Sequence, residues 1–197
     1  MRVPTDEHPL DVDGELVLFG KHLTHRGARI PYGDIESLGY SASSQAADVA
    51  PAAQGTRLGI RLGNGQSISC GSDTALISEG NAKRIENAYA FLRQITFRKR
   101  LSARVRTLET QGFVDIDDVR IFSNGDIERG DARFNLRMSR KNNAFFIGTS
   151  GACGIRYPDE VLVGEKGTSM SSKRIQFRLG NDKDVIKEML EWLSKAD

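Results

Sequence analysis

Leu16 to Gly27 reads LVLFGKHLTHRG, and Val119 to Gly130 reads VRIFSNGDIERG. The two stretches align without a gap at an offset of 103 positions, which pairs Phe19 with Phe122, Arg26 with Arg129 and Gly27 with Gly130. Each stretch has an apolar run, a short turn that contains glycine, and a second run that leads back, which is typical of a β-hairpin. The pattern predicts two structural units of one design.

A helix with an apolar stripe follows each hairpin at a similar distance. The spacing from Phe19 to Phe91 is 72 residues, and that from Phe122 to Trp192 is 70. We therefore expect an α+β fold in which mainly antiparallel strands precede one closing helix, and in which this arrangement occurs twice. The expected divisions are an acidic tail at 1–13, a first unit at 14–96, the second half of a connecting helix at 97–111, and a second unit at 112–197.

Apolar residues alternate with polar ones in three further stretches, as they do in half-buried strands. The apolar positions are Leu58, Ile60 and Leu62, then Phe134, Leu136 and Met138, and then Ile175, Phe177 and Leu179. The outward positions hold arginines: Arg57 with Arg61, Arg133 with Arg137, and Arg174 with Arg178. The stretches RLGIRLGN at 57–64 and RIQFRLGN at 174–181 are alike but lie at different distances from their helices, so either a hairpin has moved or the likeness is chance.

Two connecting segments have contrasting compositions. Ser41 to Gly55, SASSQAADVAPAAQG, has no large apolar residue except Val49, and we expect a mobile loop because it can bury too little to offset its ordering entropy. Ala82 to Gln111 contains neither glycine nor proline and predicts one long helix from about Asn81. Its apolar positions change face near Phe97, so one helix would serve two cores as a stiff connector; the alternative is two helices with a break at Thr96 and Phe97.

Composition is that of an ordinary globular protein. The 197 residues are 39% hydrophobic and 27% charged, and the net charge is +2, which is too small for a whole-molecule field that gathers nucleic acid or anionic lipid. No export signal and no apolar run near the ~20 residues of a membrane span is visible, so we expect a cytoplasmic protein. Cys70 and Cys153 are expected to be reduced, buried thiols.

No catalytic or metal-binding pattern emerges from the sequence. His22 and His25 have the odd spacing that places strand residues on opposite faces, so they cannot grip one ion. Asp115, Asp117 and Asp118 are explained as residues on the solvent-exposed face of a strand. We therefore expect a protein that is not an enzyme and that needs no metal or other cofactor.

The hairpin LVLFGKHLTHRG, the following ARIPYGDIESLGY (Ala28 to Tyr40) and the helix IENAYAFL (Ile85 to Leu92) resemble the pleckstrin-homology-like (PH-like) domains of bacteria. VRIFSNGDIERG and the helix DVIKEMLEWL (Asp184 to Leu193) are similar to a more divergent member. The resemblance implies two small barrels or meanders, each closed by a C-terminal helix. It also implies a binding or assembly module, since family members mostly have such roles.

The expected function is therefore a non-catalytic protein-interaction module that binds a partner protein or itself. The alternative is an anion-binding regulator, whose ligand is a phosphorylated molecule, a cyclic dinucleotide or a lipid head group. Its basic face would lie in the second unit and comprise Arg129, Arg133, Arg137, Arg140, Lys141, Lys173 and Arg174. A solvated sheet face explains the same residues, and nucleic acid is disfavoured because no aromatic residues are interleaved with the basic ones.

Overall fold

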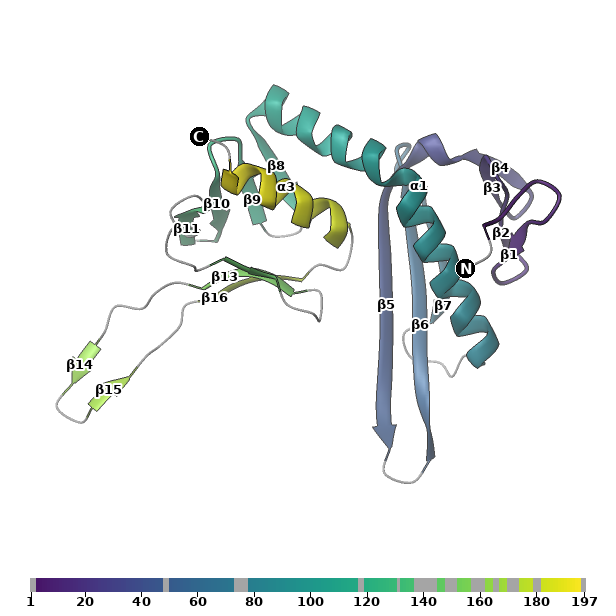
Figure 1. Cartoon of the computed structure of the whole chain (residues 1–197), viewed down its shortest axis with the longest axis horizontal. Coiled ribbons are helices and arrows are strands. Elements are labelled where there is room, and N and C mark those ends of the chain that lie inside the picture. Colours follow the sequence, from purple (N-terminus) through teal and green to yellow (C-terminus); the bar gives the residue numbers. More distant parts are fainter. Residues whose placement is uncertain are drawn as a thin grey trace. The chain divides into compact units, whose positions relative to one another are not determined.

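The computed structural model has an α+β fold built on antiparallel sheets (Figure 1). It describes residues 3–47, 50–72, 78–116, 119–130, 132–136, 145–147, 152–156, 162–164, 167–169, 174–178 and 182–195. The chain forms two compact units: unit 1 is Met1–Arg100 with Gly180–Asp182, and unit 2 is Leu101–Leu179 with Lys183–Asp197. Within the described ranges, no helix is long and apolar enough to cross a membrane.

Unit 1 contains two antiparallel meanders and most of a long helix. The first sheet has the order β1 (Leu10–Asp11), β2 (Leu16–Leu18), β3 (His22–His25) and β4 (Ala28–Pro31). A 3-10 turn, η1 (Tyr32–Asp34), leads to the second sheet, β5 (Ile35–Ala47), β6 (Ala50–Leu62) and β7 (Ser67–Ser72). Helix α1 (Glu79–Gln111) follows.

The core of unit 1 draws on both sheets and on the helix. The strands of the first sheet contribute Leu16, Leu18 and Leu23, and those of the second contribute Leu38, Leu58, Ile60 and Cys70, among others. Helix α1 adds Ile85, Ala88, Phe91 and Leu92, which recur at the spacing of one helix face. The alternation predicted for Leu58, Ile60 and Leu62 is confirmed, because all three are buried.

Unit 2 repeats the order of four strands, three strands and a helix. Its first sheet is β8 (Phe113–Ile116), β9 (Val119–Phe122), β10 (Asp126–Arg129) and β11 (Ala132–Asn135). Its second sheet has the order β12 (Phe145–Ile147), β13 (Ala152–Arg156) and β16 (Arg174–Arg178), and helix α3 (Lys183–Lys195) follows. Between β13 and β16 the chain forms a separate two-stranded hairpin, β14 (Leu162–Gly164) and β15 (Gly167–Ser169).

Both units contain the predicted hairpin, but the gapless alignment of 16–27 with 119–130 is off by one residue after the first turn. In unit 1, His25 pairs with Ala28, so the reversal consists of Arg26 and Gly27, both with positive φ. In unit 2, the equivalent pair is Arg129 with Ala132, so the offset there is 104 positions. Gly27 and Gly130 are thus not equivalent, because the turn between β9 and β10 holds one residue more than the turn between β2 and β3.

The topology also decides between the two explanations for the RLGN likeness. The stretch at 57–64 lies in and after β6, which is the central strand of its sheet. The stretch at 174–181 begins with β16, which lies at a sheet edge and directly precedes its helix, as β7 does in unit 1. The likeness is therefore chance, and β6 corresponds in order to β13.

Helix α1 is continuous, as the absence of glycine and proline predicted, and the alternative of two helices is wrong. Ile85 and Leu92 lie in the core of unit 1, whereas Leu108 lies in the core of unit 2 with residues of α3. Ile95 has the helical spacing of the stripe that holds Ile85 and Leu92, but it is 41% exposed and does not continue the buried face.

The segment Ser41 to Gly55 is mostly strand, which corrects the expectation of a loop. Its described residues continue β5 and β6, and the register runs from Ser41↔Arg57 through Ser43↔Gly55 to Ala47↔Ala50. The prediction failed because it counted only side-chain burial. Backbone pairing that starts at the buried Leu38↔Ile60 position extends along both strands without needing apolar side chains.

Gly71 marks a close approach between β7 and its neighbours. Its φ is +86°, and a Cβ atom there would lie 2.1 Å from the carbonyl oxygen of Thr56 and 2.8 Å from Ile85 Cδ1. Any side chain would collide with backbone in a conformation that disfavours L residues. Glycine is therefore required at this position.

A buried ion pair lies in unit 1. Arg100 is 1% exposed and Asp182 is 3% exposed, and Arg100 Nη1 is paired with Asp182 Oδ1. Asp182 Oδ1 also accepts a hydrogen bond from the Leu38 N–H at 2.9 Å, and the Asp182 N–H donates to the Leu38 carbonyl oxygen at 2.7 Å. Asp182 thereby occupies the outer edge of β5 at Leu38, although these residues are far apart in the sequence.

The described strands form open sheets and do not close into a barrel. The closed form of the expected small barrels is therefore not seen among them. What the structure shows is the coarser arrangement of antiparallel sheets, each group followed by a helix.

Candidate functional site

The candidate site is the outer face of the β5–β6–β7 sheet. Residues that alternate with the buried positions fall on this face, since side chains along a strand point to opposite sides in turn. The cross-strand register arranges them in three rows: Ser37, Arg61 and Ser67; Gly39, Gly59 and Ser69; and Ser41, Arg57 and Gly71. The face thus carries small residues and two arginines, with glycine opposite glycine in the central row.

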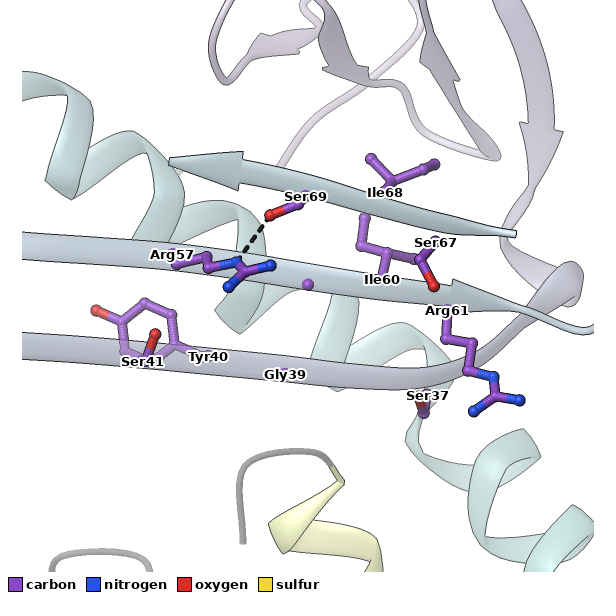
Figure 2. A pocket seen from close by; sticks show the side chains of 11 residues that line it. Ser37, Gly39, Tyr40, Ser41, Arg57, Ile60, Arg61, Ser67, Ile68 and Ser69 are labelled. Atoms are coloured by element: carbon purple, nitrogen blue, oxygen red, sulfur yellow. Dashed lines mark hydrogen bonds between the residues drawn. The ribbon is translucent and has the colours of Figure 1, made fainter. Parts of the chain in front are cut away.

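All of these residues except Gly71 line a hollow of about 410 Å³ on the sheet (Figure 2). Eleven residues line it, and all of them belong to β5, β6 or β7. A Cβ atom at Gly59 would meet nothing within 4 Å, so the floor is open at that point. The hollow exists because the central row has no side chain that would fill it.

The two arginines of the face reach in different directions. Arg57 Nε donates a hydrogen bond of 2.8 Å to Ser69 Oγ, so its guanidinium leans toward β7 (Figure 2). Arg61 Nε lies 3.6 Å from Glu36 Oε2, on the side of β5. Both arginines are exposed, and an exposed ion pair such as that of Arg61 with Glu36 is worth only about 0–1 kcal/mol.

The chemistry of this face suits binding better than catalysis. Its charged lining residues, among those described, are arginines, which stay protonated and donate hydrogen bonds to carboxylate or phosphate. The described lining residues include serine hydroxyls but no histidine or carboxylate that would activate them. The face can hold an anionic or hydrogen-bonding ligand.

The basic face expected in unit 2 is only partly described. Arg133, on β11, is exposed, but its guanidinium lies 2.8 Å from Asp126 Oδ2 and 3.4 Å from Glu128 Oε1. The hydrogen bond from Arg133 is the first cause that holds the pKa of Asp126 below its usual value. Arg133 is thus engaged with two carboxylates, and an anion at this place would compete with both.

For two of the other predicted residues the structure describes only the backbone position, and the remaining four lie outside the described residues. Arg129 ends β10, beside Ala132 of β11. Arg174 begins β16, beside Arg156 of β13, and so belongs to a different sheet. Arg137, Arg140, Lys141 and Lys173 lie outside the described residues.

Other groups that could carry chemistry are dispersed. The His22 ring stacks on Phe19 with centroids 4.7 Å apart, while His25 Nε2 lies 3.9 Å from Glu15 Oε2. Asp115 holds Arg120 through two hydrogen bonds of 2.7 and 3.1 Å. In the part of the chain that the structure describes, no three histidine, cysteine or acidic residues come together as metal ligands.

Cys70 is buried as expected and is a free thiol. Burial, and next a hydrogen bond to Asp13, raises the pKa of this thiol far above its ordinary value. The thiolate is therefore suppressed, and Cys70 acts as a small core residue and not as a nucleophile. The side chain of Cys153 lies outside the described set.

No protein-family model, no curated protein and no solved structure matches this chain. The function must therefore be argued from the geometry of the chain itself.

The sequence contained part of the signal for this site. Arg57 and Arg61 were expected on an outward face, and Gly59 lies between them in the sequence. The sequence did not show the strand register. The register places Gly39 and Ser69 beside Gly59, and these small residues leave a hollow between Arg57 and Arg61.

Proposed function

We propose that this protein is a non-catalytic interaction module built of two PH-like units, and that it binds a partner protein on the outer face of β5–β6–β7. The order of strands supports the PH-like assignment. In each unit a four-stranded antiparallel sheet precedes a three-stranded one, and a helix follows. A binding role is what the resemblance to PH-like domains implies, and the fold alone does not establish it.

The observation that carries the proposal is the hollow lined by glycine, serine and arginine. A sheet face that only meets water has no need of glycine opposite glycine, because glycine weakens strands. At Gly59, where a Cβ atom would meet nothing within 4 Å, it does allow another chain to approach the backbone closely. The β5–β6 hairpin also extends beyond β7, whose pairing with β6 ends at Thr56↔Ser72.

Site-specific photo-crosslinking in the native host tests this proposal. A photoreactive amino acid is placed at Ser67 or Ser69 on the face, and at Arg29, which is exposed on β4, as the control. We expect discrete protein adducts from the two face positions and none from the control. Equal adducts from all three positions, or none from the face, would overturn the proposal.

A further inference from the structure

We infer that an exposed stripe of helix α1 binds the phosphate backbone of double-stranded nucleic acid without reading its sequence. This α1 stripe consists of Ile95, Arg98, Lys99, Ser102 and Arg106. It belongs to a different element from the β5–β6–β7 face, so the inference goes beyond the proposed function and does not depend on it.

The charge of the chain is concentrated in the middle of α1. The stretch from Asn87 to Leu108, NAYAFLRQITFRKRLSARVRTL, has six basic residues and no acidic one, in a chain whose net charge is only +2. The rest of the chain is therefore net acidic. A local field of one sign can gather a polyanion where the field of the whole molecule is too weak to do so.

Three of these cations lie on one side of the helix. At 100° per residue, Arg98, Lys99 and Arg106 fall within a sector about 100° wide. Ile95 and Ser102 fall inside the same sector, and all five side chains are exposed. The stripe thus presents three positive charges to one ligand surface.

The three cations are available to a ligand. Within the described ranges, Arg98, Lys99 and Arg106 form neither an ion pair nor a side-chain hydrogen bond. Arg100 differs from them, because it is buried and paired with Asp182. An anion that arrives at the α1 stripe therefore displaces no existing carboxylate partner.

The composition of the stripe separates nucleic acid from other acidic partners. Protein–protein interfaces are rich in aromatic residues and depleted of lysine, and helices that lie on membranes have a broad apolar face. The stripe has one large apolar residue, Ile95, which is 41% exposed. Arginine, lysine and serine are the side chains that hold duplex phosphates, and Ser102 lies between Lys99 and Arg106.

The stripe suits a duplex better than a single strand. It contains no aromatic residue, so bases of a single strand would find no side chain on which to stack. Arg98 and Arg106 are separated by about 12 Å along the helix axis. A duplex carries one negative charge per about 1.7 Å of its axis, so each cation can meet its own phosphate.

Binding of a duplex to the full-length protein tests the inference. The probe is a short fluorescent DNA duplex of random sequence, followed by anisotropy at increasing salt. Three phosphate contacts predict a slope of log Kobs against log salt of about −2.7, which is about a 40-fold loss between about 50 and 200 mM. We expect R98Q, K99Q and R106Q each to reduce the slope by about one and to weaken binding roughly tenfold at the lower salt concentration.

Four further variants serve as controls. K21Q removes the same charge from an exposed turn between β2 and β3, and R106K keeps the charge, so both should bind as the wild type does. I95S should also bind normally, because a phosphate contact does not use this side chain, whereas a protein partner would lose an apolar contact. E109Q should bind more tightly, since Glu109 is the carboxylate one helical turn beyond Arg106. Circular dichroism shows that each variant remains folded.

Several outcomes would overturn the inference. The first is an equal loss of binding in K21Q and R98Q, and the second is a salt slope that stays the same when all three cations are replaced. Tighter binding of a single strand of the same length would exclude the duplex. Equal affinity for poly-glutamate would assign the stripe to an acidic protein, and equal affinity for vesicles of equimolar phosphatidylglycerol and phosphatidylcholine would assign it to a lipid surface.

Discussion

The buried pair between Arg100 and Asp182 gives the sharpest prediction about stability. We expect Asp182→Asn to destabilise unit 1 by about 3–5 kcal/mol, because it removes the negative charge that is paired with the buried guanidinium of Arg100. Asparagine keeps the size of the side chain, and it tolerates the positive φ of 54° at this position. Its amide oxygen can still accept the hydrogen bond from the Leu38 N–H. The loss therefore reports the charge and not the shape.

A matched control distinguishes the effect of burial on stability from the effect of losing an ion pair. Asp115 forms an ion pair with Arg120 at 2.7 Å, but both side chains are about half exposed. We expect Asp115→Asn to cost under about 1 kcal/mol, because water solvates the arginine that is left behind. The large difference expected between the two variants follows from solvent access alone.

The assay is unfolding in guanidinium chloride, followed by circular dichroism and by hydrogen exchange of the β5 amides. Arg100→Met with Asp182→Asn should recover part of the loss, since the double variant buries no unpaired charge. The reasoning is refuted if Asp182→Asn costs no more than Asp115→Asn, or if the two single losses at Arg100 and Asp182 simply add.

Three further predictions concern unit cores and ion pairs. Gly71→Ala should lower the unfolding midpoint markedly, whereas Gly65→Ala, also at positive φ but in open space, should cost only about 1 kcal/mol; similar losses in thermal melts would contradict the contact geometry. Cys70 should resist alkylation at neutral pH until the chain is denatured, because its pKa is raised and the thiolate is rare; mass spectrometry of labelled native protein would expose an error. The pKa of Asp126 is lowered in the folded state, so the stability it contributes is full above about pH 4 and falls below it. Arg133→Gln should flatten this acid loss, and unchanged acid titration curves would disprove the coupling.

Local patterns in the sequence predicted the elements well. The alternation at Leu58, Ile60 and Leu62 identified a strand with a buried face, and the uninterrupted stretch to Gln111 identified one continuous helix. Both signals depend on residues that are close in the sequence, so a single chain reveals them.

The predictions failed where the structure depends on contacts between residues that are far apart in the sequence. Ser41 to Gly55 has the composition of a loop, yet most of it pairs as strand because a ladder already formed at Leu38 and Ile60 extends along it. Ile95 fits the helical stripe by its spacing, yet it is 41% exposed in the folded chain. The gapless repeat missed an inserted residue, because only the registers show which positions face each other.

The candidate site shows the same division. Periodicity placed Arg57 and Arg61 on one outward face, because alternation is a property of a single strand. Tertiary pairing placed Gly39 and Ser69 beside Gly59, and it brought Asp182 to Arg100, 82 positions away. The sequence alone determined the repeated hairpins and helices of this protein, since these follow from local spacing. Which residues meet across the sheet and in the core was decided by the folded chain, because register and burial depend on partners that no local pattern identifies.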